Sequence, residues 1–285
     1  MRDFLVSRRA RITPEQAGLP AYGGNRRVAG LRREEVALLA GVSIDYYTRL
    51  ERGRAHGASD SVLEGIARAL HLDEAERAHL FDLARACAPA VPRAPRRPSP
   101  QQVRPSVRRI LDSMTTTPAY VRNARLDILA ANQLGAALFA PILASPARPV
   151  NNARFLFLDP AAPGFYPGWE RQAQDVVAML RTEAGRSPHD KELSNLIGEL
   201  STRSENFRTW WAAHNVRFHR TGIKRFRHPV VGDLTLTFEA FDLAADSGLR
   251  ISAYTAEPGT PSDDALKVLA SWAATPDRAA AADGD

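Results

Sequence analysis

The sequence predicts an all-α N-terminal domain of five helices and an α+β C-terminal domain whose antiparallel sheet packs with helices. A length of 285 residues is typical of about two domains. Residues 88–105 are rich in Pro and Arg and have almost nothing to bury, which is typical of a semi-rigid linker. Short helical patterns at 1–87 change to mixed helical and strand patterns at 106–275. Residues 276–285 are mostly Ala, Asp and Gly, and we expect a disordered tail.

The strongest local signal lies at residues 33–52, after a helix at 2–9 that turns Phe4 and Leu5 inward and a long connection at 10–30. The first helix of this signal has an apolar face made by Val36, Ala37, Leu39 and Ala40. Gly41 ends that helix, because glycine adopts a left-handed backbone at little cost. Ser43 is a good N-cap for the next helix, on which Tyr47 and Leu50 point inward.

A small residue, a glycine turn, an apolar plug at Val42 and a capped second helix form the helix-turn-helix pattern, which the spacing favours over an ordinary helical hairpin. The start of such a second helix enters the major groove of DNA. Arg49 is predicted to pair with guanine. Asp45 would accept from a cytosine amino group or simply favour the helix N-terminus. On the same outward face, the candidate phosphate contacts are Tyr46, Thr48 and Arg52. Ile44 of that face and the cap residue Ser43 are further DNA-binding candidates.

The flanks of the motif complete the five-helix domain. Ser59 caps a fourth helix that runs to Leu70, and a fifth follows at 73–86. Basic residues beside the motif would hold the DNA backbone or reach a minor groove, although solubility explains them as well. These additional DNA-binding candidates are Arg26, Arg27, Arg32 and Arg54.

The charge and composition agree with a nucleic-acid-binding domain. Residues 1–105 carry 18 Arg against 12 acidic residues, whereas 106–285 carry 20 basic and 20 acidic residues. A solvated basic surface would give the same numbers. Cys87 is the only cysteine, which excludes an internal disulfide and a cysteine-rich zinc site. We find no signal peptide and no apolar run of about 20 residues, so we expect a cytoplasmic protein.

The C-terminal half alternates strand and helix patterns. Two strands are predicted within 119–131 around a turn at Asn123, followed by a helix at 132–139. Helices are expected on one face of the sheet. The later elements are expected to be helices at 169–184, 189–200 and 205–214 and strands at 217–227, 233–243 and 250–256.

Aromatic residues in this half form either ordinary core or the wall of an apolar cavity. The cluster comprises Phe155, Phe157, Phe165, Tyr166, Trp169, Phe207, Trp210 and Trp211. Polar side chains that would orient a ligand are Arg122, Asn132, His214, Arg225 and His228. Among the aromatic residues, the ligand-binding candidates are Phe155, Trp169, Trp210 and Trp211. No phosphate-binding loop, nucleophile elbow or paired-acid arrangement is present, so we expect neither an enzyme nor a cofactor or metal site.

Two sets of motifs resemble one family over nearly the whole chain. In the N-terminal part they are GLRREEVA (30–37), AGVS (40–43), YYTRLERGR (46–54) and ARAL (67–70). In the C-terminal part they are FLDP (157–160), VVAMLR (176–181), GELS (198–201), KRFRHPVVGDLTL (224–236) and AEPG (256–259). The sequence thereby resembles Xre-type helix-turn-helix regulators of the MmyB-like branch. This resemblance implies a PAS-like ligand-binding domain, a small apolar ligand with long-chain fatty acids as the suggested class, and a homodimer.

The resulting hypothesis is a sequence-specific transcriptional regulator whose C-terminal ligand modulates DNA binding. Three alternatives remain open. An enzyme fused to a DNA-binding domain would need a nucleophile or base among the aromatic residues of the C-terminal half. A C-terminal domain used only for dimerisation or protein interaction would have an interior filled by its own side chains. A thiol sensor would act through Cys87, which is otherwise simply a packed residue.

Overall fold

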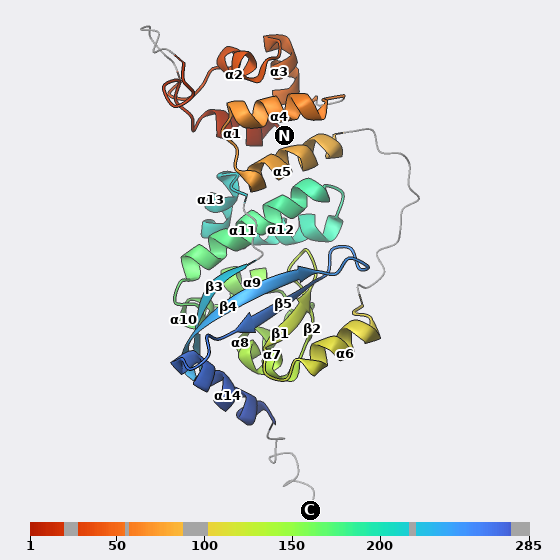
Figure 1. Ribbon diagram of the computed structural model, residues 1–285, viewed down its shortest axis with the longest axis vertical. Coiled ribbons are helices and arrows are strands. Elements are labelled where there is room, and N and C mark those ends of the chain that lie inside the picture. Colours follow the sequence, from red (N-terminus) through yellow and green to blue (C-terminus); the bar gives the residue numbers. More distant parts are fainter. Residues whose placement is uncertain (20–27, 55–56, 88–101, 217–220, 275–285) are drawn as a thin grey trace, which may run out of the picture. The chain divides into compact units, whose positions relative to one another are not determined.

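The computed structural model describes all residues except 20–27, 55–56, 88–101, 217–220 and 275–285. The chain forms two compact units (Figure 1). The first, called unit 1, comprises 1–96, 177–195 and 208–218, and the second, unit 2, comprises 97–176, 196–207 and 219–285. The predicted fold class, a five-helix helix-turn-helix domain followed by an α+β PAS-like domain, is confirmed.

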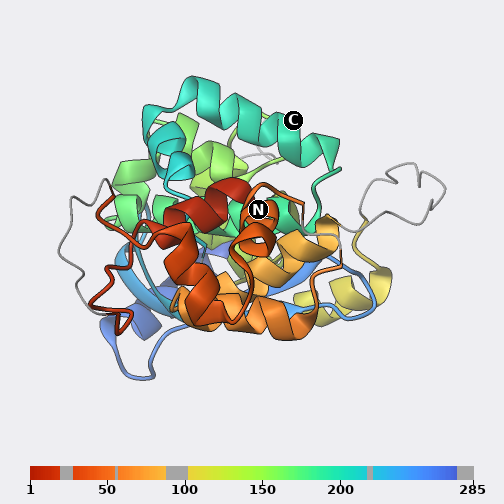
Figure 2. The same cartoon turned by 90° about the horizontal axis from the view of Figure 1, so that it is seen from above.

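Unit 1 contains the five predicted N-terminal helices, seen from above in Figure 2. They are α1 (Arg2–Arg9), α2 (Arg33–Ala40), α3 (Ile44–Glu51), α4 (Asp60–Ala69) and α5 (Glu74–Ala86). Ser43, Ser59 and Asp73 cap α3, α4 and α5 by accepting from backbone N–H groups. The core side chains, each at most 2% exposed, include Phe4, Leu5, Leu31, Val36, Tyr47, Leu50, Leu63, Ile66, Leu70 and Leu80.

One glycine ends α2, and a second allows α4 to approach α2 closely. Gly41 has φ +70°, the left-handed conformation that ends α2 as predicted. A Cβ added at Gly65 of α4 would lie 2.6 Å from the carbonyl oxygen of Ala40 in α2. The contact between α2 and α4 therefore depends on a residue without a side chain. This residue sets how closely the two helices pack.

Unit 2 is built on one antiparallel sheet with strand order β2-β1-β5-β4-β3. The strands are β1 (Ala119–Arg122), β2 (Ile128–Ala131), β3 (Thr221–His228), β4 (Gly232–Asp242) and β5 (Arg250–Thr255). All five were predicted, although residues 217–220 of one predicted strand lie outside the described residues. Cross-strand pairs such as Phe238 with Tyr254 and Lys224 with Leu236 place their side chains on the same face.

The sheet carries helices on both faces, so the expectation of helices on one face was wrong. Val107 and Leu111 of α6 (Pro105–Ser113) pack in one cluster with Val121 and Ile251. Tyr120 alternates with Val121 along β1 and faces the other side, against Phe139, the turn residue between two short helices. The helix α6 was not predicted, although Val107, Ile110 and Leu111 lie at helical spacing. The other helices that begin in unit 2 are α7 (Gln133–Leu138), α8 (Ala140–Leu143), α9 (Asn152–Leu158), α10 (Ala162–Phe165), α11 (Trp169–Arg186) and α14 (Pro261–Ala274).

Two further helices are divided between the units along the chain. α12 (Lys191–Arg203) contributes residues up to Asn195 to unit 1, and α13 (Glu205–Ala212) contributes residues from Arg208 onward to unit 1. α11 likewise contributes to unit 1 from Val177 onward. Among the described residues, none of the helices combines the length and apolar character needed to cross a bilayer.

Candidate DNA interface and ligand site

The second helix of the motif, α3, is held at both ends by its own sequence. Ser43 Oγ accepts a hydrogen bond from the backbone N–H of Tyr46 over 3.1 Å. Tyr47 and Leu50 are 0% and 1% exposed and anchor the inner side. The opposite side is therefore free of the core, which is the geometry that a DNA-reading helix requires.

The predicted DNA-binding residues near α3 lie on this outer side. Ile44 is 52% exposed, and the Arg49 guanidinium lies 5.7 Å from the centre of the Tyr46 ring. This contact supports the extended Arg49 side chain at the surface. Tyr46 and Thr48 are half-buried, and the exposed members of the set are Arg32, Ser43, Ile44, Asp45, Arg49, Arg52 and Arg54. Arg26 and Arg27 lie outside the described residues.

A buried carboxylate fixes α3 against its neighbours. Glu51 is 2% exposed and accepts from Arg9 Nε of α1 at 2.9 Å and from Arg33 Nε of α2. Arg9 also donates to the carbonyl of Leu31 at 2.7 Å, just before α2. The Glu51 carboxylate thus links α3 to both α1 and α2. The sequence alone did not indicate this role for Glu51.

A hollow opens beside α3 and is rich in arginine. Its lining combines Arg9, Arg32 and Arg33 with Ile44 and Thr48, and is completed by Val28 and Glu34. The Arg32 side chain is 44% exposed and lies 3.4 Å from Glu34, which is 57% exposed. Guanidinium groups around a recess next to the recognition helix suit contacts to phosphate oxygens.

In unit 2 aromatic rings cover the face of the sheet opposite α6, which we call the inner face. Phe226 lies at the centre, with ring centroids of Phe139, Phe165, Tyr166 and Tyr254 at 5.6–5.9 Å. We call the set formed by Tyr120, Phe139, Phe155, Phe165, Tyr166, Phe226, Phe238 and Tyr254 the aromatic cluster. Phe155, Phe165 and Tyr166 were predicted for this environment. The other members come from strands and α8's start, where no aromatic run marked them.

Two cations are buried beside the aromatic cluster. Arg122 is 6% exposed and Lys224 is 7% exposed. Burial lowers the pKa of the Arg122 guanidinium and lowers that of the Lys224 amino group to about 7; the positive charge of Arg122 adds to the second shift, and Asp175 opposes it. Arg122 was a predicted ligand-binding residue. Lys224 was missed, yet its alternation with the exposed Ile223 and Arg225 was a signal that it points inward.

Two other predicted ligand-binding residues have structural partners for their polar atoms. Asn132 caps α7: its Oδ1 accepts from Ala119 and Gly135, and its Nδ2 donates to backbone carbonyls of the preceding loop. His228 lies 3.0 Å from the Ala137 carbonyl through Nε2 and accepts from the Val230 N–H through Nδ1. These bonds leave neither side chain a free polar atom for a ligand.

The remaining predicted ligand-binding residues lie on several different elements. Arg225 is exposed on the opposite face of β3 from Lys224. Trp169 donates from Nε1 to the Leu156 carbonyl at 2.7 Å within unit 2. Trp210, Trp211 and His214 belong to unit 1, whereas the residues of the aromatic cluster belong to unit 2.

Within unit 1, arginine side chains contact His214 and Trp211. The Arg181 guanidinium lies 3.9 Å above the Trp211 ring and 2.9 Å from Nδ1 of His214. Arg8 of α1 donates to the His214 carbonyl at 2.5 Å. Burial, assisted by Arg181, lowers the pKa of His214 to about 4. The first helix of the unit is thereby joined to a residue 206 positions further along the chain.

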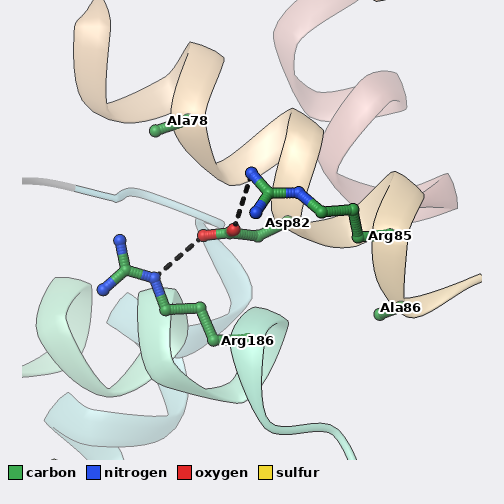
Figure 3. A pocket seen from close by; sticks show the side chains of 5 residues that line it. All are labelled: Ala78, Asp82, Arg85, Ala86 and Arg186. Atoms are coloured by element: carbon green, nitrogen blue, oxygen red, sulfur yellow. Dashed lines mark hydrogen bonds and ion pairs between the residues drawn. The ribbon is translucent and has the colours of Figure 1, made fainter. Parts of the chain in front are cut away.

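A second link in the same unit is an ion pair between α5 and α11. Figure 3 shows Asp82 between two guanidinium groups, Arg186 at 2.9 Å and Arg85 at 3.4 Å. Nearby, a Cβ added at Gly185 would lie 2.5 Å from the His79 ring. Charge and close packing therefore both connect α5 with the end of α11. No three His, Cys, Asp or Glu side chains in the described ranges are gathered so as to hold a metal ion.

The comparisons with known proteins agree with this division of roles. A helix-turn-helix domain model matches residues 8–80. The model of the MmyB-like transcription regulator ligand binding domain matches residues 103–269, which is more than half of the chain. The chain has no significant match among curated proteins. With an exposed α3 and these two matches, the chain is a DNA-binding transcription regulator and belongs to the MmyB-like family.

Proposed function

We propose that the protein binds a specific operator as a homodimer, and that a small apolar ligand held in unit 2 changes its affinity for DNA. The observation that carries this proposal is the exposed outer side of α3 in a chain that also has a ligand-binding domain. Two copies would present two α3 helices to half-sites about one helical turn apart.

In this proposal Arg49 reads a base and the arginines around the hollow bind phosphates. The exposure of Arg49 in the last turn of α3, 5.7 Å from the centre of the Tyr46 ring, supports this role. Arg32 and Arg33 lie on the hollow beside it. The proposed phosphate contacts also include Arg52 and Arg54 and, outside the described residues, Arg26 and Arg27.

The DNA-binding part is tested by selecting operators from random duplexes and measuring affinities by fluorescence anisotropy. Arg49→Ala should lower affinity for the selected site by about tenfold to a hundredfold and relax the preference at one base pair. Arg68→Ala is the matched control, since Arg68 is an exposed arginine on α4. Equal losses for both variants, with the base preference intact, would contradict base reading by Arg49.

The ligand is proposed to be apolar because the domain matched as ligand-binding has a core rich in aromatic rings, and long-chain fatty acids are the class that the family resemblance suggests. Native mass spectrometry of the purified protein tests both ligand and dimer. A bound small molecule on a dimer mass is expected. A bare protein whose operator affinity does not change with added fatty acid would favour the alternative, a C-terminal domain used only for dimerisation or protein interaction.

Control of DNA binding by the ligand is supported by the chain segments that make up unit 1. It contains both the helix-turn-helix region and parts of the ligand-domain match, joined by the Asp82–Arg186 ion pair and by Arg8 with His214. A ligand that favours one arrangement of these contacts would shift the population competent for DNA. The change in operator affinity on adding ligand should therefore shrink in Arg186→Ala.

A further inference from the structure

The last helix of unit 2, α14, carries apolar side chains on two of its faces. Leu266 and Leu269 are buried in the core of the unit. On another face, Val268 is 59% exposed and Trp272 is 53% exposed. These two large side chains lie one turn apart, so they adjoin each other on the helix surface. A helix that packs against its own domain needs one apolar face, so the second face indicates a partner.

The exposed apolar face of α14 forms a continuous stripe. Its members follow one another at intervals of four, three and four residues, the spacing that keeps side chains on one side of a helix. We call this set the α14 stripe, and it consists of Pro261, Ala265, Val268 and Trp272. Ala265 is partly exposed, and the other three are exposed. Single exposed apolar residues are ordinary, whereas contiguous ones mark interaction surfaces.

The chain after α14 offers little to cover the α14 stripe. Residues 275–285 contain no apolar residue larger than proline. In the described part of unit 2, the other large apolar side chains of comparable exposure lie on other elements, namely Ile110, Ile223, Val230 and Phe241. The ligand-domain match ends at residue 269, so Trp272 lies beyond it. The stripe is thus a feature of this chain that the family match does not explain, and its partner is to be sought on another molecule.

The α14 stripe is complementary to a second copy of itself. When two α14 helices run antiparallel about a two-fold axis beside Val268, Trp272 of one copy lies opposite Ala265 of the other. The small Ala265 leaves room for the indole ring, so a large side chain meets a small one. The two-fold axis makes this contact twice, and Val268 meets its own counterpart between the two contacts. Tryptophan is also among the residues that contribute most to interface affinity.

Charges beside the α14 stripe favour the antiparallel order. The first turn of α14 carries Asp263 and Asp264, whereas residues 271–274 carry no charge. Lys267 pairs with Asp263 at 2.9 Å and with Asp264 at 3.1 Å, so the N-terminal half keeps a net negative charge. A parallel pair would bring two acidic ends together. An antiparallel pair separates them and also opposes the two helix dipoles.

We propose that the α14 stripe is a dimerisation surface, and that its partner is α14 of a second copy of this chain in antiparallel orientation. This rests on the proposed function, in which the protein acts as a homodimer, and it assigns the surface that the dimer uses. The stripe is small compared with the interfaces of obligate dimers, so the dimer should dissociate on dilution.

The test is analytical ultracentrifugation of the full chain over a concentration series without DNA. Trp272→Ala should raise the dimer dissociation constant at least about thirtyfold, because truncating a tryptophan at the centre of an interface has effects of this size. Ile110→Ala is the matched control, since Ile110 is 54% exposed on α6 and should leave the constant unchanged. In a Cys87→Ser background, Val268→Cys should form a covalent dimer on mild oxidation faster than Ile110→Cys, because the two-fold axis lies beside residue 268.

The outcomes separate this inference from the proposed function. If the wild type dimerises and Trp272→Ala dimerises equally well, the α14 assignment is wrong and the proposed homodimer stands. Equal weakening by Trp272→Ala and Ile110→Ala would also contradict the assignment. A wild type that is monomeric at every concentration would contradict both, and slow reaction of the Val268→Cys thiol with a maleimide would then indicate that the protein's own chain covers the stripe. Because Trp272 is half exposed, Trp272→Ala should keep the wild-type melting temperature, so a lost dimer is not a consequence of unfolding.

Discussion

Glu51 offers a quantitative test of how α3 is positioned for DNA. Glu51→Ala removes a carboxylate that is 2% exposed and leaves Arg9, itself 13% exposed, without its acid. Removing one member of a buried ion pair costs about 3–5 kcal/mol. The pair with Arg33 adds little, because Arg33 is 49% exposed and solvent screens it. Arg9 keeps its bond to the Leu31 carbonyl, which places the expected loss near the lower limit, about 3 kcal/mol.

The measurement is urea denaturation followed by far-ultraviolet circular dichroism, combined with operator affinity. Glu51→Gln retains one acceptor and should lose about half as much stability as Glu51→Ala. Both should bind the operator more weakly, since α3 is held less firmly to α1 and α2. Glu64→Ala, which breaks the exposed pair with Arg77, is the control and should not shift the transition measurably. A Glu51→Ala protein that unfolds at the wild-type urea concentration would refute the anchoring role.

Three further predictions concern unit 1 and its contacts. Gly65→Ala should destabilise by about 1–2 kcal/mol in urea, because a clash with the Ala40 carbonyl outweighs the helix propensity gained, whereas Gly198→Ala, in open space on α12, should not destabilise. Burial lowers the pKa of His79 to about 3, so its contribution to stability is complete above pH 6.5 and is lost as the pH falls toward 3; His79→Gln should flatten the melting temperature over that range. In a double-mutant cycle, Asp82→Ala and Arg186→Ala should each reduce ligand control of operator affinity, and the double variant should show no further loss; additive losses would contradict a shared contact.

The sequence could predict the elements whose local signals agree with their environment. The helix-turn-helix was predictable because Gly41, Ser43 and Tyr47 each fulfil a local rule for a turn, a cap and a core position. The strand at 233–243 was predictable because its apolar residues alternate. By contrast, α6 has few apolar residues, and its packing on the sheet depends on partners far along the chain such as Ile251. Such partners are invisible to local patterns.

Residue roles at the ligand site were harder to predict for a different reason. Polarity and position drew attention to Asn132 and His228, but backbone groups use their polar atoms, and only coordinates reveal those partners. Lys224 drew no attention, because a lysine in a strand is ordinarily solvated. Its neighbours nevertheless constrain it, since exposed Ile223 and Arg225 require the residue between them to face the interior. The informative signal in such a strand is that a charged residue lies on the same face as buried residues, as Lys224 does with Phe226 and His228. A cation on the buried face of a strand must be paired or neutralised.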